Sequence, residues 1–108
     1  METVLKAIAE PNRQRILRLV SDTEMSAGEI ASHFTVSGPA ISQHLKVLKE
    51  AGLVGERREG PRRLYSLRRD GLADVREFVE SLWAEGLERL KFAAEAEQRR
   101  KKRGRRGR

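Results

Sequence analysis

Apolar residues recur at helical spacing through the first twenty positions and predict two helices separated by a proline. The first helix is expected over residues 2–9, and the second begins at Pro11, because proline is well tolerated in the first turn of a helix. The apolar positions of these helices are Val4, Leu5, Ile8 and Ala9, followed by Ile16, Leu17, Leu19 and Val20. Residues 21–25 are expected to form a connection.

A local signature at Ser26 marks the start of a third, short helix. Ser26 and Glu29 have the spacing of a capping box, in which the side chain of each residue satisfies a free backbone group of the other. Met25 and Ile30 flank the cap in the positions of a hydrophobic staple. We therefore expect a helix over residues 26–33, followed by a tight link.

A fourth helix is expected over residues 37–51, and both of its ends are marked. Ser37 or Gly38 caps its start, and Pro39 lies in its first turn. Gly52 is suited to the left-handed cap at its end. Its buried stripe is Ile41, Leu45 and Leu48. The short helix, the tight turn and this helix together predict a helix-turn-helix.

A β-hairpin is expected next. Residues 53–58 and 63–67 flank the turn sequence Glu59-Gly60-Pro61-Arg62. Tyr65 and Leu67 share one face of the second strand, which we place inward. The expected fold is therefore mainly α with a small β-hairpin: a winged helix-turn-helix of about five helices.

The last apolar stripe is longer than one small domain can cover. A helix is expected over residues 71–97, roughly 25 residues against a mean of about 11–12. We expect its apolar side to form a dimer interface with the first helix; the alternative is that it packs only on its own domain. The expected interface residues are Val4, Leu5, Ile8, Leu72, Val75, Phe78, Val79, Leu82, Trp83 and Leu87.

The net charge of +7 comes from the end of the chain and hides a polarised remainder. Residues 98–108 carry eight basic residues and no acidic one, so the remainder has a net charge of −1. Within it, residues 37–69 carry +5 and residues 70–97 carry −5. A basic middle beside an acidic helix indicates one phosphate-facing surface, unless each run is simply a solvated face.

The chain thus divides into a domain over residues 1–97 and a basic tail over residues 98–108. The tail has low complexity and is expected to be disordered. We favour non-specific DNA affinity as its role, through release of counterions from the phosphates. A solubility tail and an RNA-binding tail are the alternatives.

The outer face of the fourth helix carries side chains suited to the major groove of DNA. Glutamine can bond adenine at two positions, serine bonds several bases, and Ala40 can contact a thymine methyl group. Lys46 and Lys49 are expected to contact phosphates. The expected DNA-binding residues of this helix are Ser37, Gly38, Pro39, Ala40, Ser42, Gln43, His44, Lys46 and Lys49.

The hairpin adds four arginines near its tip that can reach the DNA backbone or a narrow minor groove. They are Arg57, Arg58, Arg62 and Arg63. The alternative is an exposed hairpin whose charges only deter aggregation at its edges.

Several classes of function are not supported by the residues present. The chain has no cysteine, no apolar run of the ~20 residues that a membrane span needs, and no signal-peptide pattern. We expect a cytoplasmic protein without a membrane partner. No nucleophile–base–carboxylate set or glycine-rich phosphate loop occurs, so neither an enzyme nor a cofactor is expected.

The sequence resembles the ArsR/SmtB family of winged-helix repressors. Three segments carry the resemblance: residues 9–17 (AEPNRQRIL), 41–54 (ISQHLKVLKEAGLV) and 57–65 (RREGPRRLY). The resemblance implies a homodimer that represses an operator, with the first and last helices at the dimer interface. It also implies that His44 takes the place of the recognition-helix histidine.

The metal boxes typical of that family are missing. The first helix of the helix-turn-helix has no Cys-x-Cys, and residues 70–97 contain no histidine. Zinc normally takes His or Cys among its ligands, so no metal is expected and His33 is interpreted as a surface or cap residue. The chain therefore resembles the metal-independent, SdpR-like branch, in which Trp83 and Glu88-Arg89-Leu90 have counterparts.

Two hypotheses of function follow. The first is a sequence-specific regulator, a homodimeric repressor that binds a palindromic operator on double-stranded DNA through residues 37–51 and 54–67. The second is an architectural DNA-binding protein with little sequence preference.

Overall fold

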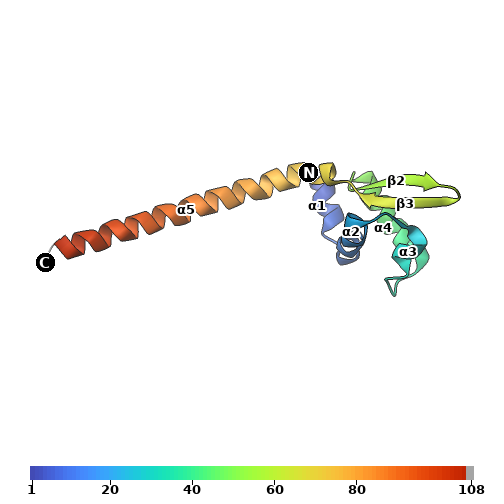
Figure 1. Cartoon of the computed structure of the whole chain (residues 1–108), viewed down its shortest axis with the longest axis horizontal. Coiled ribbons are helices and arrows are strands. Elements are labelled where there is room, and N and C mark those ends of the chain that lie inside the picture. Colours follow the sequence, from blue (N-terminus) through green and yellow to red (C-terminus); the bar gives the residue numbers. More distant parts are fainter. Residues whose placement is uncertain (107–108) are drawn as a thin grey trace. The chain divides into compact units, whose positions relative to one another are not determined.

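The computed structural model describes the backbone of residues 1–106 and the side-chain surroundings of residues 1–101. The chain forms two compact units, Met1–Val75 and Arg76–Arg108. Within the described residues, the elements in chain order are α1 (Glu2–Ile8), α2 (Pro11–Asp22), β1 (Met25–Ser26), α3 (Ala27–Ala31), α4 (Gly38–Glu50), β2 (Val54–Glu59), β3 (Arg62–Leu67), a 3-10 turn η1 (Arg69–Leu72) and α5 (Ala73–Arg106) (Figure 1).

The helix starts lie where the cap residues predict them. The capping box of α3 is complete: Ser26 Oγ accepts from Glu29 N, and Glu29 Oε1 accepts from Ser26 N, both at 3.2 Å. Ser37, rather than Gly38, caps α4, because its hydroxyl accepts from Ala40 N at 3.3 Å. These bonds satisfy backbone donors that no helix can satisfy internally.

The end of α4 is a Schellman motif. Gly52 adopts φ of 76°, its N–H donates to Lys49 O at 3.0 Å, and Leu53 N–H donates to Leu48 O at 2.9 Å. Leu48 and Leu53 are both fully buried. The motif turns the chain directly from α4 into β2.

The 3-10 turn η1 packs closely against the residues that follow α4. A Cβ atom placed on Gly71 would clash with the carbonyl oxygen of Gly52 and lie 2.9 Å from its carbonyl carbon. Only a glycine therefore allows the two backbones this close approach.

The sheet has one strand more than the sequence predicts. β2 and β3 form the expected hairpin, with Glu59 opposite Arg62 and a two-residue Gly60-Pro61 loop. Only Gly60 has positive φ there, 61°, as in a type II′ turn. β1 also pairs with β3, placing Met25 opposite Tyr65, so the sheet order is β1-β3-β2. The predicted connection over residues 21–25 is thus wrong: it holds the end of α2 and the start of β1.

The core of the first unit gathers buried residues from helices α1 to α4 and from β1 and β2, with three of them from α4. The predicted stripe of α4 is fully buried, as are Ile16 and Val20 of α2. The buried apolar residues are Ala7, Ile16, Val20, Met25, Ile30, Ile41, Leu45, Leu48, Leu53 and Val54. Tyr65 and Leu67 pack partly against this core, but Leu64 on the opposite face is also buried. Both faces of β3 are therefore partly covered.

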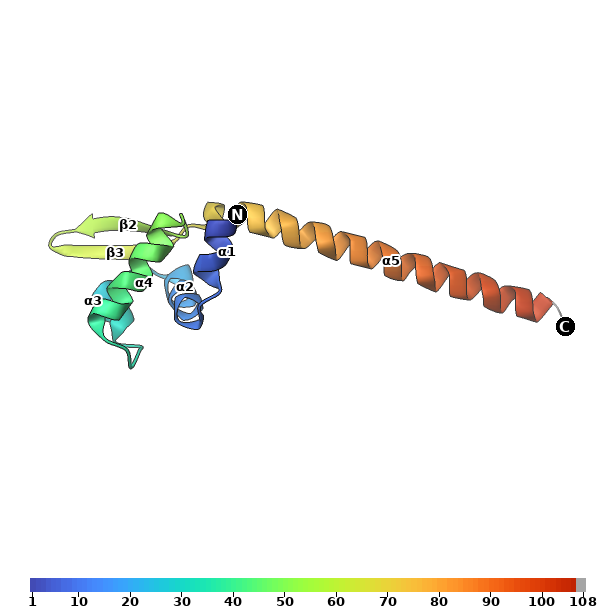
Figure 2. The ribbon, with the colours of Figure 1, turned by 180° about the vertical axis from the view of Figure 1, so that it is seen from behind.

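Three residues expected at a dimer interface also pack partly against this core. Val4, Ile8 and Leu72 pack partly against it, whereas Leu5 is 40% exposed. Figure 2 shows α1 and α2 beside one another, and both α2 and α4 contact the hairpin, α2 at β3 and α4 at β2.

Helix α5 is longer than predicted, because it continues to Arg106 rather than ending at residue 97. Residues 98–106 are thus helical rather than disordered, and residues 107 and 108 lie outside the described residues. The continuation has a physical basis, since arginine and lysine are good helix formers and Arg100 pairs with Glu97 at 2.7 Å.

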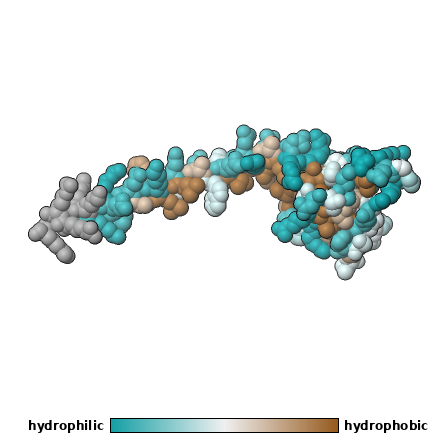
Figure 3. All heavy atoms as spheres, viewed as in Figure 1, coloured by the Kyte–Doolittle hydropathy of each residue, from teal (hydrophilic) through white to brown (hydrophobic). Residues whose placement is uncertain are grey.

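The apolar side chains of α5 are largely exposed. Figure 3 shows them along one side of the helix. The exposed large apolar residues of α5 are Phe78, Val79, Leu82, Trp83, Leu87, Leu90 and Phe92, and Val75 is half-buried.

Candidate nucleic-acid interface

The outer side of α4 presents a polar, basic surface. Because its apolar stripe is turned into the core, the residues between the stripe positions are left outside. Figure 1 shows this helix next to the hairpin formed by β2 and β3. The exposed predicted DNA-binding residues are Ser37, Gly38, Pro39, Ser42, Gln43, Lys46 and Lys49, while Ala40 is half-buried.

His44 lies on the side of α4 that faces the junction of α1 and α2, away from Ser42, Lys46 and Lys49. Its ring Nδ1 is 3.4 Å from an Arg13 guanidinium nitrogen and 3.8 Å from Glu10 Oε2, and the side chain is only 19% exposed. Arg13 also donates to the carbonyl oxygen of Ala7 at 2.6 Å and to that of Lys6 at 3.1 Å. Through Arg13, the ring is linked to the junction of α1 and α2, and its contact with DNA stays a prediction.

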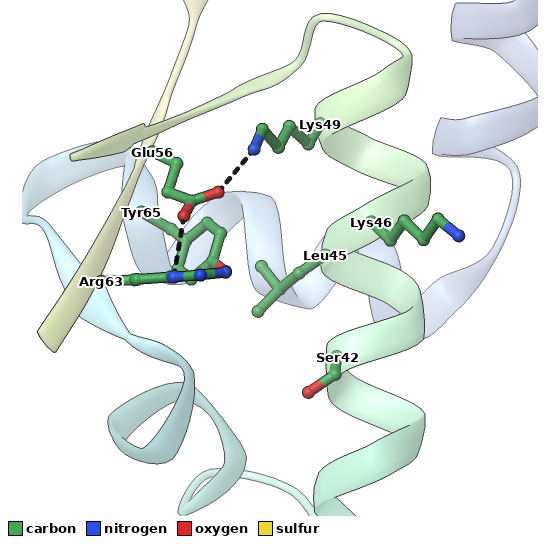
Figure 4. Close-up of a pocket in the computed structure, with 7 residues that line it drawn as sticks. All are labelled: Ser42, Leu45, Lys46, Lys49, Glu56, Arg63 and Tyr65. Carbon is green, nitrogen blue, oxygen red and sulfur yellow. Dashed lines mark hydrogen bonds and ion pairs between the residues drawn. The ribbon is translucent and has the colours of Figure 1, made fainter. Parts of the chain in front are cut away.

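A hollow of about 280 Å³ lies between α4 and the hairpin (Figure 4). Glu56 of β2 is central to it: Lys49 Nζ donates to Glu56 Oε2 at 2.6 Å, and Arg63 Nε lies 3.3 Å from Glu56 Oε1. Lys46 points away from this carboxylate (Figure 4). The remaining lining residues are Ser42, Leu45 and Tyr65.

Two of the other hairpin arginines, Arg57 and Arg62, are held by carboxylates outside the hollow. Arg57 makes a two-pronged contact with Glu24, at 3.0 and 2.8 Å, and a further one with Glu59 at 3.1 Å. Arg62 pairs with Glu29, the capping-box residue of α3. Arg58 forms no ion pair with any residue that the structure describes.

Hydrogen bonds and neighbouring positive charges lower the pKa values of three of these carboxylates, Glu24, Glu29 and Glu56. A hydrogen bond from Arg57 lowers the pKa of Glu24. Bonds from Ser26, then the charge of Arg62, lower the pKa of Glu29. The hydrogen bond from Lys49 is the main cause for Glu56, whose pKa is lowered further by the charges of Lys49, Arg63 and Arg58. All three groups therefore favour the ionised form at neutral pH.

The sequence-based predictions did not include the ion-pair roles of Glu24, Glu29 and Glu56. Each partner lies far along the chain or across the hairpin, and Glu24 and Arg57 are 33 positions apart. For Glu56 a signal exists, because Arg63 lies diagonally across the hairpin from it, two positions from the opposite residue Tyr65, and opposite charges at such positions interact.

Within residues 1–101, no group of three potential ligand side chains comes together to hold a metal ion. His33 is exposed, and its carbonyl oxygen accepts from Arg15 at 3.0 Å. Among the helices of the described chain, none is both long and apolar enough to cross a membrane.

Fold and surface together define a class of protein. A capped helix-turn-helix whose second helix exposes polar and basic side chains, followed by an arginine-bearing hairpin, is a winged helix-turn-helix of the DNA-binding type.

Comparison with known proteins gives the family. Residues 10–56 match the model of the bacterial regulatory protein family arsR. The transcriptional repressor SdpR of Bacillus subtilis (strain 168) is 45% identical over 74 residues, which cover 68% of this chain and 82% of that protein. The HTH-type transcriptional regulator Rv2034 of Mycobacterium tuberculosis is 42% identical, over 76% of this chain and 77% of that protein.

A solved structure agrees with this result. The crystal structure of a possible transcriptional regulator for arsenical resistance superposes with a TM-score of 0.68 at 45% identity, covering 80% of this chain and 90% of that one. The chain belongs to the ArsR family, and it is a DNA-binding transcriptional regulator rather than an enzyme.

Proposed function

We propose that this regulator is a homodimeric repressor that binds a palindromic operator. The observation that carries the proposal is the basic surface formed by the outer side of α4 and the neighbouring face of the hairpin. Its four cations, Lys46, Lys49, Arg58 and Arg63, suit DNA phosphates, and Ser42 and Gln43 suit base edges. The name of SdpR, a repressor, favours repression over activation.

The exposed apolar side of α5 supports the dimer. Trp83 is 74% exposed and Leu82 is 53% exposed. Large contiguous apolar patches of this kind usually mark an interaction site. The same stripe on a second copy is a matching surface, and a two-fold dimer presents two recognition helices to half-sites roughly 34 Å apart.

The ratio of specific to non-specific affinity tests the proposal against the architectural alternative. We expect footprinting on the protein's own promoter to show a protected inverted repeat, bound ~10³-fold or more tighter than random DNA. Loss of the protein should then raise expression from that promoter. Uniform coating of DNA without a preferred site would support the architectural alternative, and a fall in expression would indicate an activator.

Two substitutions in α4 separate base reading from phosphate binding. Gln43→Ala should cost about 1–3 kcal/mol at one base position, because glutamine can make two bonds to one adenine. Lys46→Ala should weaken all sequences alike, because a phosphate contact carries no sequence information. Affinity measurements over a set of single-base operator variants check both. Equal, uniform losses would show that Gln43 is not the base reader.

A charge placed on the apolar side of α5 tests the dimer. Leu82→Glu should yield a monomer in light scattering at micromolar concentration, since a buried unpaired carboxylate is costly. Ser81→Glu is the matched control, because Ser81 lies about 100° around the helix from Leu82, off the apolar stripe, and the change should leave the dimer intact. Trp83 is the only tryptophan, so its emission should shift to longer wavelength when the dimer dissociates. A wild-type monomer would contradict the proposal.

A further inference from the structure

We infer that the two faces of the wing divide its four arginines. Arg58 and Arg63, on the face turned toward α4, contact the DNA backbone. Arg57 and Arg62, on the opposite face, are positioning residues that fasten the hairpin to the rest of the domain. The inference rests on the proposed function and deepens it, because it assigns separate roles to residues that the sequence presents as one cluster.

The strand register separates the arginines. Glu56 lies opposite Tyr65 and Arg58 opposite Arg63, and residues opposite each other in a sheet share a face. Side chains alternate along a strand, so Arg57 falls on the other face, with its partner Leu64. Glu59 and Arg62 are the next pair on that other face.

Contacts identify which face adjoins the recognition helix. Glu56 accepts a hydrogen bond from Lys49 of α4, and Arg63 lines the same hollow as Ser42 and Lys46 (Figure 4). A duplex seated on the outer side of α4 therefore meets this face of the wing first. Arg58 lies on it and has no ion-pair partner among the described residues.

The opposite face is tied to the start of the helix-turn-helix. Arg57 donates two hydrogen bonds to Glu24, which precedes β1, and Arg62 pairs with Glu29 of α3. Glu29 also caps its own helix, so Arg62 is linked to a residue that is already held in place. These contacts connect the tip half of the hairpin to two elements upstream of the recognition helix.

The charges of the two faces differ in sign. The face toward α4, with that helix's lysines, holds Lys46, Lys49, Arg58 and Arg63 against Glu56, a net charge of +3. The opposite face holds Arg57 and Arg62 against Glu24, Glu29 and Glu59, a net charge of −1. Phosphates are attracted to the first face and not to the second.

The salt dependence of DNA binding tests this division, because each lost phosphate contact lowers the slope of log affinity against log salt by about 1. The probe is a mixed-sequence duplex titrated with the full chain at several salt concentrations. Arg58→Gln and Arg63→Gln should each lower the slope by about 1. The matched variants Arg57→Gln and Arg62→Gln should leave the slope unchanged.

A second readout records the positioning role. Arg57→Gln and Glu24→Gln should both speed amide hydrogen exchange in β2 and β3, and the exchanged pair Arg57→Glu with Glu24→Arg should restore protection. Glu24→Gln removes the main partner of Arg57 and leaves it only the contact with Glu59, so a steeper salt slope in this variant would overturn the inference. Equal slopes for Arg57→Gln and Arg58→Gln would overturn it as well.

Failure of the proposed function gives a different result. If the wild-type chain binds duplex DNA without sequence preference, the operator-specific repressor is excluded, but the slopes still separate the two faces. If the wild-type chain shows its operator preference and the four variants have the same slope, the division of the wing alone is wrong.

Discussion

Gly71 shows how one residue governs the exit from the recognition helix. Its backbone lies against the Gly52 carbonyl, where no Cβ fits. Gly71→Ala should therefore lower the free energy of unfolding by about 1–3 kcal/mol, the usual cost of overpacking. Denaturant unfolding followed by circular dichroism measures the change.

Gly28→Ala is the control for this substitution. A Cβ there meets only Ser26 Oγ, at an ordinary 4.0 Å, so alanine should stabilise by about 0.4–1 kcal/mol through the unfolded chain. If Gly71→Ala were as stable as Gly28→Ala, the close approach of η1 to the end of α4 would be refuted.

The types of residue in the sequence predicted the helix caps correctly but did not predict the ion pairs. Ser26, Ser37 and Gly52 act on backbone groups within a few positions, so their roles follow from local sequence. The role of Arg57 depends on Glu24, which only the folded chain brings near.

At the scale of elements, the wing is the part most dependent on charge. Glu24, Glu29 and Glu56 all have pKa values below the ordinary 4.5 in the folded chain. Their pairs therefore stabilise the fold above about pH 4.5, and this contribution is lost as pH falls through the lower, folded-state values.

The corresponding prediction concerns thermal stability. The melting temperature of the wild type should fall as the pH drops below about 4.5, and the fall should be smaller when all three residues are changed to glutamine. Glutamine keeps the capping box at Glu29, so the comparison isolates the ionised groups. Parallel melting curves for the two proteins over this range would contradict the assignment.

The length of an element decides whether its hydrophobic periodicity can be recognised in the sequence. The helical stripes of α2 and α4 were long enough to be identified, and their residues form the core. β1 has only two residues, too few for any alternation, and exists because β3 offers it backbone partners.

At the scale of the whole molecule, the positive charge of residues 98–108 is distinct from the positive charge of the surface formed by α4 and the hairpin. Deleting residues 98–108 removes eight cations and should flatten the salt dependence of DNA binding, because fewer counterions are released. The ratio of operator to random-DNA affinity should stay constant. Titrations at several salt concentrations, on both DNAs, check this; an unchanged slope would show that the segment does not contact DNA.

The sequence by itself determined the order of the helices, their caps, the hairpin and the outward face of α4. All of these depend on contacts between near neighbours or on the periodicity of apolar residues. It also indicated a DNA-binding protein, because the basic residues of the DNA-binding surface lie close together in the sequence, in α4 and the hairpin that follows it.

Only the tertiary structure decided how those residues are used. It turned His44 toward Glu10 and Arg13, placed Glu56 between Lys49 and Arg63, and put the wing arginines on two faces with different partners. The physical reason is that an ion pair or a shared face depends on strand register and helix packing, which bring together residues far apart in the chain.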